Sequence, residues 1–164
     1  MRILDAEQIA RKLSRMAIEL LERHVEHRRV FLLGINNNGF ETARRLRDLI
    51  AAEGHALECV LRHVRLSPAD PMDSGTEYEG DIAELAGAHV VIVDDVANTG
   101  RTAYYACRPI MAVLPASVEV AVLVDRRHKS FPVSSDYVGL TLATTLQEDI
   151  RVYYDEADTR VELF

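Results

Sequence analysis

The fold is decided by one stretch of the chain, Val90-Val91-Ile92-Val93-Asp94-Asp95-Val96-Ala97-Asn98-Thr99-Gly100-Arg101-Thr102. Its first four residues are apolar and β-branched, which predicts a strand buried on both faces, as in a parallel sheet. Two adjacent carboxylates, Asp94 and Asp95, follow where that strand should end. Residues 98–100 then supply turn chemistry, and the segment 103–111 can be helical. The predicted order is therefore buried strand, acidic pair, turn of small residues and helix.

This order predicts a site for a phosphorylated sugar. A turn of small residues before a helix aims backbone N–H groups and hydroxyls at one point, where the helix dipole also favours negative charge. Arg101 adds a cation, so a terminal phosphate suits this turn. Asp94 and Asp95 are acceptors, suited to two vicinal hydroxyls or to the waters around Mg²⁺. A ribose 5-phosphate carries both groups. The alternative is a buried strand with a solvated acidic end, which an acidic pair alone would usually indicate.

The stretch resembles the phosphoribosyl pyrophosphate (PRPP) signature of type I phosphoribosyltransferases. The wider chain resembles one branch of them, the PyrR group of pyrimidine-operon regulators with uracil phosphoribosyltransferase activity. The similarity runs nearly end to end. Outside the signature it is carried by Ile3-Leu4-Asp5 with the helix to His24, Gly34-Ile35, Leu123-Val124-Asp125-Arg126, Asp136-Tyr137-Val138-Gly139 and Arg160-Val161.

The resemblance implies an α/β fold: a mostly parallel twisted sheet flanked by helices, with a small hood that binds the base. It implies transfer of ribose 5-phosphate from PRPP to a nucleobase, here uracil, with release of pyrophosphate. Mg²⁺ would enter with PRPP, so no direct metal ligand is expected. The implied catalytic residues are Asp94 and Asp95. The implied 5-phosphate site consists of Ala97, Asn98, Thr99, Gly100, Arg101 and Thr102.

A second buried strand, predicted for Arg29 to Ile35, leads into a polar turn and a helix from Glu41 to Ala52. In the family the equivalent turn holds pyrophosphate and normally contains a Lys or Arg. The residues here are Asn36, Asn37, Asn38 and Gly39. Their amides can donate to phosphate, but without the charge-assisted part of the interaction. Arg44 and Arg45 are candidates to replace that charge. The alternative function is a PyrR-like nucleotide sensor with little or no catalysis, either as an RNA-binding attenuator or without RNA.

The base is expected at the segment Asp136-Tyr137-Val138-Gly139. In related enzymes an aromatic ring stacks on the base and the next residue binds its edge through backbone groups. The resemblance assigns these roles to Tyr137 and Val138; a Tyr packed in a strand turn is the structural alternative. Purine enzymes carry a Lys where this chain has Ser134, and often an Asp where it has Asn98. Both differences favour a pyrimidine, or a protein without turnover.

Other segments complete the predicted fold. Strands are expected at Ala56 to Leu66 and Val118 to Val124, and a terminal hairpin at Ile150 to Tyr154 and Arg160 to Phe164. Pro109 should kink or end the helix that follows the signature. Pro68 to Gly80 is predicted to be a loop, matching the family's flexible loop that closes over PRPP, with Arg65 at its base. The basic run 126–129 follows a strand beside the predicted cleft, so a solvated loop and a functional segment are equally supported.

Composition limits the remaining choices. With 164 residues the chain is expected to form a single domain, residues 1–164. A net charge of −7 argues against broad nucleic-acid or acidic-membrane binding, so RNA is a possible but disfavoured partner. Cys59 and Cys107 are expected to be buried thiols in a reducing cytoplasm. Neither a signal peptide nor a membrane span is expected, and the family suggests a homodimer or higher homo-oligomer.

The N-terminal segment predicts an amphipathic surface helix. Asp5 can cap it, and one face carries the apolar residues Ile9, Leu13, Met16, Ala17, Leu20 and Leu21. In the family this helix contributes to an RNA-binding face. Ser14 and Arg15 fit that role, whereas Ile18 stands where the regulators commonly carry His. A packed surface helix is the simpler interpretation.

Overall fold

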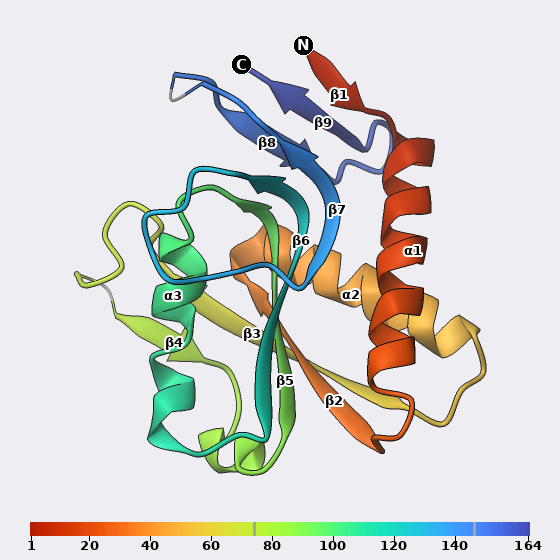
Figure 1. The fold of residues 1–164 in the computed structure, drawn as a ribbon, viewed down its shortest axis with the longest axis vertical. Helices are drawn as coiled ribbons and strands as arrows, with labels where there is room; N and C mark the ends of the chain where they lie inside the picture. The colour runs from red at the N-terminus through yellow and green to blue at the C-terminus, as the bar shows by residue number, and fades with distance from the viewer. Residues whose placement is uncertain (74, 146) are drawn as a thin grey trace.

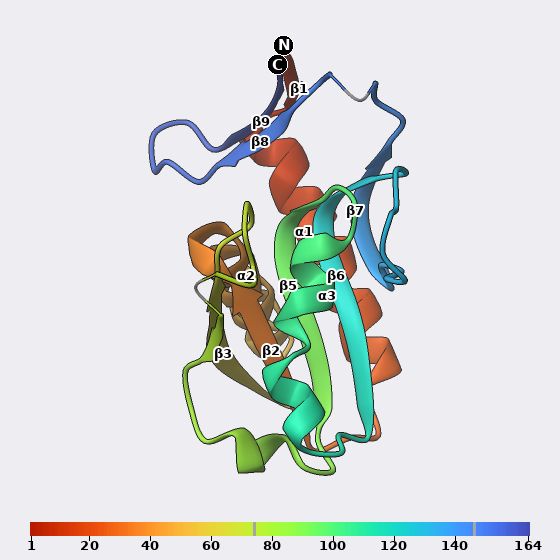
Figure 2. The same cartoon turned by 90° about the vertical axis from the view of Figure 1, so that its left-hand side faces the viewer.

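The computed structural model describes residues 1–73, 75–145 and 147–164. It shows an α/β fold with a six-stranded, mostly parallel sheet, flanked by helices, and a separate three-stranded sheet (Figures 1 and 2). The elements are β1 (Arg2–Leu4), α1 (Ala6–Arg23), β2 (Arg29–Ile35), α2 (Asn36–Ala52), β3 (Glu58–Leu66), β4 (Thr76–Tyr78), β5 (His89–Ala97), α3 (Arg101–Ala106), β6 (Ser117–Arg126), β7 (Tyr137–Leu142), β8 (Ile150–Tyr153) and β9 (Arg160–Leu163). Two short 3₁₀ helices are formed by Ile82–Leu85 and Pro109–Ala112. None of the helices in the described ranges is both long and apolar enough to span a membrane.

The large sheet has the strand order β4-β3-β2-β5-β6-β7, with only β4 antiparallel to its neighbour. Helices α1 and α2 pack on one face of this sheet and α3 on the other (Figure 2). The chain leaves β2 through α2 toward one side and leaves β5 through α3 toward the other. The direction of winding therefore reverses between β2 and β5, and the carboxyl ends of strands at such a reversal form a crevice.

The sheet opens at the acidic pair. The β2–β5 ladder ends at the pair Gly34–Val93, whereas the β5–β6 ladder continues to Ala97–Asp125. β5 therefore extends beyond its neighbour β2. In this extension only the edge of β5 that faces β6 is paired. Asp94 and Asp95 lie in this one-sided extension, just past the last β2 contact. The predicted strand 90–93 is thus the doubly paired core of a longer strand.

The three-stranded sheet, ordered β1-β9-β8, lies beyond the carboxyl ends of the central parallel strands (Figures 1 and 2). The terminal hairpin predicted from the sequence is confirmed as β8 and β9. The antiparallel partner β1 was not predicted, because three residues next to a helix cap carry no strand signal of their own. This pairing brings the two chain termini together. The small sheet is the candidate for the predicted hood.

Helix α1 begins where the sequence predicts it. Asp5 accepts a hydrogen bond from the Gln8 amide at 2.8 Å, and the Gln8 side chain accepts one from the Asp5 amide at 3.0 Å. This reciprocal capping box satisfies two backbone donors that the first helical turn would leave free. The buried face of the helix carries Ile9, Leu13, Met16, Ala17 and Leu20.

Two predicted boundaries are wrong, each for a local reason. The helix expected from Glu41 begins at Asn36, whose φ of 51° turns the chain directly into α2; Asn tolerates this left-handed conformation better than most residues. The segment expected to be a loop, 68–80, contains β4, and residue 74 lies outside the described residues. The break expected at Pro109 is confirmed: the segment 103–111 is helical only to Ala106 and gives way to a 3₁₀ turn at Pro109, whose ring has no N–H donor.

Candidate active site

Two adjoining clefts lie at the reversal point of the large sheet. The larger, of about 670 Å³, is lined by the three asparagines Asn36, Asn37 and Asn38 and by the acidic pair Asp94 and Asp95. The smaller, of about 320 Å³, is lined by the turn 97–102. Asp94, Val96, Asn98 and Thr102 belong to both linings. The structure therefore brings the acidic pair, the Asn turn and the predicted phosphate turn around one connected space.

The two carboxylates of the acidic pair have different environments. Asp94 sits partly buried in the cleft wall, and its Oδ1 accepts the Asp95 amide at 2.9 Å. Partial loss of hydration, followed by the charge of Asp95, raises the pKa of Asp94 well above its ordinary value. Asp95 instead accepts the Val96 amide at 2.9 Å and an Asn38 amide at 2.8 Å. The raised pKa means that the fold disfavours the charged form of Asp94, whereas the Asp95 carboxylate has two hydrogen-bond donors from the protein.

The Asn turn, residues 36–39, uses two of its three amides within the protein. The Asn36 side-chain oxygen accepts the Leu66 amide at 3.1 Å, closing the end of β3. Asn38 Nδ2 donates to Asp95 Oδ2 at 2.8 Å and to the carbonyl oxygen of Val152 at 2.9 Å. Within the described residues the Asn37 side chain makes no hydrogen bond. Asn37 is therefore the amide of this turn that is available to a ligand.

Glycines let α2 approach the strands this closely. A Cβ at position 39 would lie 2.6 Å from the carbonyl oxygen of Val93, and one at position 34 would lie 2.3 Å from the Cα of Phe40. Neither neighbour can move without shifting backbone. Gly39 thus allows the first turn of α2 to rest directly against β5 beside the acidic pair.

The phosphate turn, residues 97–102, presents free donors. The carbonyl oxygen of Thr99 accepts the amides of Ser130 and Phe131 at 2.9 and 3.2 Å, which directs that carbonyl away from the cleft. Among the described residues the backbone N–H groups of Asn98, Thr99 and Gly100 donate to no partner. Gly100 has a φ of 85°, a conformation that favours glycine. Because α3 has only six residues, the turn's own amides and hydroxyls are the main attraction for an anion.

Arg126 and Lys129 hold this turn. Both belong to the basic run 126–129, to which the sequence alone assigned no definite role. Arg126 is only 8% exposed and donates to the Asn98 Oδ1 at 3.0 Å, to the Thr144 hydroxyl at 2.6 Å and to the Thr145 carbonyl at 2.8 Å. Lys129 donates to the carbonyl oxygen of Asn98 at 3.1 Å and pairs with Asp125. The position directly after a buried strand was the sequence signal for Arg126; its burial was not predictable.

Other cations differ in their access to the clefts. Arg65 lines the larger cleft and pairs with Glu79 at 3.0 Å, so the cation at the base of the 68–80 segment does reach the site. Arg101 donates a hydrogen bond to the carbonyl oxygen of Pro68, at the start of that segment. The sequence candidates Arg44 and Arg45 do not reach it: both pair with Glu41 on the surface of α2, and neither belongs to a described cleft lining.

The structure does not bring Tyr137 and Val138 to the clefts. Tyr137 is fully buried on the α1 side of the sheet, where its hydroxyl donates to Glu119 at 3.0 Å and Arg23 covers its ring at 4.9 Å. The carbonyl oxygen of Val138 accepts a hydrogen bond from Arg15 at 2.9 Å. The aromatic ring expected to stack on the base is therefore a core residue, and the carbonyl expected to bind the base accepts instead from Arg15 of α1.

Two arginines on the outer face of α1 have acidic partners. Arg11 pairs with Glu7, and Arg15 pairs with Glu19 at 2.8 Å while holding β7. Cations with neighbouring acidic partners attract phosphate weakly, because neutralising phosphate needs a surplus of free positive charge. This face therefore adds nothing in favour of RNA binding.

Comparison with known proteins agrees with the geometry. Residues 1–156 match the phosphoribosyl transferase domain. The chain is 35% identical to the bifunctional protein PyrR of Bacillus pumilus, with 95% of this chain and 91% of the relative covered, and 34% identical to that of Bacillus subtilis over the same shares. A hypoxanthine phosphoribosyltransferase structure from Trypanosoma cruzi superposes with a TM-score of 0.78 at 18% identity, covering 98% of this chain and 94% of the other. A Leishmania tarentolae enzyme in complex with GMP superposes with a TM-score of 0.70 at 20% identity, covering 87% and 81%.

The solved structures share the fold. The two PyrR relatives are similar in sequence over most of this chain and most of their own length. The signature, the clefts at the sheet reversal and these matches point in one direction. The chain belongs to the phosphoribosyl transferase domain family.

Proposed function

We propose that this protein is a pentosyltransferase that moves ribose 5-phosphate from PRPP to uracil. The observation that carries the proposal is the shared cleft wall, in which Asp94 lies between the donor-rich turn 97–102 and the Asn turn 36–39. One ligand with a phosphate, a diol and a pyrophosphate would meet complementary groups in that order. The choice of uracil is supported by the PyrR-like sequence, and by Ser134 and Asn98 at positions where purine enzymes carry other residues.

In this proposal the amides of residues 98–100 and the Thr102 hydroxyl bind the 5-phosphate, each donating to a phosphate oxygen. Asp94 and Asp95 accept the two ribose hydroxyls. The sugar is thereby held with its C1 atom facing the small sheet, where Ile150 closes the cleft. Holding both ends of the ribose restricts its motion before reaction, which lowers the entropic part of the barrier.

The reaction exchanges one bond for another at C1 of the ribose. The bond from C1 to the pyrophosphate oxygen breaks, and its electron pair leaves with pyrophosphate. The N1 atom of uracil supplies the electron pair of the new C1–N bond, and the N1 proton passes to solvent. Positive charge builds on the sugar between these events. The adjacent carboxylates stabilise that charge, because they are fixed in place before it develops.

Mg²⁺ would arrive with PRPP as part of the substrate. The cleft wall is suited to it, since carboxylate and amide oxygens of Asp94, Asp95 and Asn37 line the same space and hard oxygen donors are what Mg²⁺ prefers. Bound there, the ion would neutralise charge on the departing pyrophosphate. Among the described lining residues of the larger cleft, Arg65 is a side chain that could add positive charge.

The test is an assay of pyrophosphate release. Purified protein is mixed with Mg²⁺, PRPP and one base at a time: uracil, cytosine, hypoxanthine, guanine or adenine. We expect release with uracil, and none from the Asp95→Asn variant. Arg44→Gln, a change on the surface of α2 outside both clefts, serves as the matched control and should retain activity. Release with a purine alone would overturn the uracil assignment, and no release with any base would overturn the transferase proposal.

A second candidate is a nucleotide sensor of low turnover. It is favoured by the Asn turn, which has no cation of its own and in which Asn36 and Asn38 are already engaged within the protein. A sensor would bind UMP in calorimetry and show no pyrophosphate release. The same two measurements therefore distinguish the candidates.

A further inference from the structure

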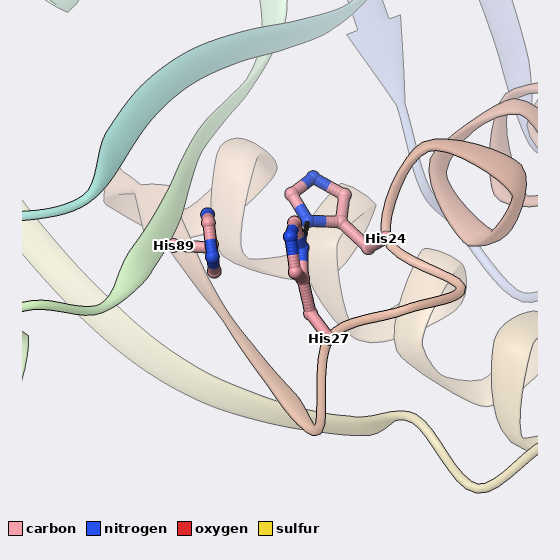
Figure 3. A group of neighbouring side chains, drawn as sticks. All are labelled: His24, His27 and His89. Atoms are coloured by element: carbon pink, nitrogen blue, oxygen red, sulfur yellow. Dashed lines mark hydrogen bonds between the residues drawn. The ribbon is translucent and has the colours of Figure 1, made fainter.

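Three histidines gather at the end of the molecule opposite the clefts. His24 is the C-cap residue of α1, His27 lies in the connection to β2, and His89 begins β5. Figure 3 shows the rings of His24 and His27 on one side facing that of His89 on the strand. One ring nitrogen from each lies within 4.8 Å of the others. Since His89 and Asp94 are five residues apart on one strand, the cluster is roughly 17 Å from the acidic pair.

Hydrogen bonds from neighbouring side chains fix two of the three rings. His24 Nε2 lies 2.6 Å from Glu119 Oε1, and His89 Nδ1 lies 2.8 Å from the Ser117 hydroxyl. The other nitrogen of His24, Nδ1, is hydrogen-bonded to His27 Nδ1, a bond that an ion would replace, and the other nitrogen of His89, Nε2, has no partner among the described residues. Histidines that bind metals are oriented in this way, with one ring nitrogen held by a carboxylate or another oxygen and the other directed at the ion.

The distances are near those of a coordination site. His24 Nδ1 and His27 Nδ1 are 2.9 Å apart. Two nitrogens bound tetrahedrally to one Zn²⁺ at the usual bond length are separated by about 3.3 Å, so an opening of a few tenths of an ångström would admit the ion. His27 and His89 are stacked, with ring centroids 3.6 Å apart and planes at 10°. Because Ser117 holds the ring of His89, the ring of His27 would have to turn about its χ2 bond, and His27 is only partly buried.

We propose that His24, His27 and His89 bind a single divalent transition metal, with Zn²⁺ as the representative ion. Neutral imidazole is a favoured ligand for this class of ion, and three protein ligands leave a fourth position for water. Partial exposure of His27 and His89 provides a route from solvent. The bound metal would cross-link the end of α1 to the first residue of β5. The site is separate from the clefts, so its role is to stabilise the fold and not to take part in transfer.

The test uses tag-free protein that has been dialysed against EDTA and then against metal-free buffer. Titration with ZnCl₂ should show one equivalent bound, and titration with Co²⁺ should give the strong visible bands of a tetrahedral site. At a free Zn²⁺ concentration 100 times the Kd, the melting temperature should rise by about 5–10 °C. Activity with PRPP should not change, which makes this test independent of the proposed transferase function.

Variants locate the site. His27→Gln and His89→Gln should each weaken Zn²⁺ binding at least tenfold and remove the Co²⁺ bands. His55→Gln is the matched control, because His55 is exposed and distant in the sequence from the cluster, and it should bind as the parent does. Equal binding by all four proteins would show an adventitious site elsewhere and overturn the proposal. Absence of a melting shift together with absence of Co²⁺ bands in the parent would also overturn it.

Discussion

Asn38 donates a hydrogen bond to the carboxylate of Asp95, with Nδ2 and Oδ2 separated by 2.8 Å. The same amide donates to Val152 in β8 at 2.9 Å, so one side chain joins the acidic pair to the small sheet. The turn that resembles a pyrophosphate loop therefore also stabilises the fold. In that turn Asn38 holds the carboxylate of Asp95, and its neighbour Asn37 lines the larger cleft.

Asn38→Ala should lower both stability and turnover. The change leaves acceptors on Asp95 and Val152 without their donor, which costs about 1–3 kcal/mol. Urea denaturation gives the free energy of unfolding, and pyrophosphate release gives turnover. Asn37→Ala is the matched control: we expect it to reduce turnover while the free energy of unfolding stays within about 0.5 kcal/mol of the parent. Equal loss of stability in both variants would contradict the division of roles.

Gly39→Ala should destabilise the protein and impair the site. Its Cβ would lie 2.6 Å from the Val93 carbonyl oxygen, so α2 must move away from β5. Such overpacking costs about 1–3 kcal/mol. Gly54→Ala, at a φ of 71° with nothing within 4 Å, adds a local backbone cost of about 1 kcal/mol and should leave turnover unchanged. Full activity of the Gly39 variant would show that the close approach is not needed.

Asp94→Asn should stabilise the protein at neutral pH while abolishing turnover. Because the pKa of Asp94 is raised in the folded state, that state retains a proton which the unfolded chain releases near pH 4. The contribution of Asp94 to stability therefore falls as pH rises from about 4 toward the raised pKa.

Thermal unfolding at two pH values checks the sign of this effect. The melting temperature of Asp94→Asn should exceed that of the parent at pH 7.5, and the difference should shrink at pH 4.5. Glu156→Gln, at an exposed position, is the control and should show no such trend. A variant less stable than the parent at pH 7.5 would mean that the Asp94 carboxylate is stabilised in the fold.

Arg126→Lys should lower turnover even though it preserves the charge. A lysine cannot reproduce the three separate bonds from Arg126 to Asn98, Thr144 and Thr145, so the phosphate turn would lose its support. We expect at least a tenfold fall in kcat/KM for PRPP. Arg127→Lys, at the exposed neighbouring position, should match the parent. If both variants matched the parent, the support of the phosphate turn by Arg126 would not be needed for turnover.

The sequence was most informative where the signal is local. The strand predicted for Arg29 to Ile35 has the observed bounds, and the capping residue of α1 and the break at Pro109 follow from side-chain chemistry within a few positions. The α/β class also follows from two buried strands that each lead into a turn and a helix. These features depend on residues close together in the chain.

Features that depend on pairing between residues far apart in the chain could not be predicted from the sequence. The end of the β2–β5 ladder at Val93 sets where the cleft opens, yet neither strand encodes it alone. Tyr137 pairs with Ala121 and turns toward α1, because strand register decides which face each residue occupies. The histidine cluster likewise joins residues 27 and 89, which share no sequence pattern.

The most direct test of the central claim is a crystal structure of the protein soaked with UMP. The account predicts the phosphate against the amides of residues 98–100, and the ribose hydroxyls on Asp94 and Asp95. A nucleotide bound elsewhere, or bound in the cleft with its sugar turned away from both carboxylates, would contradict it.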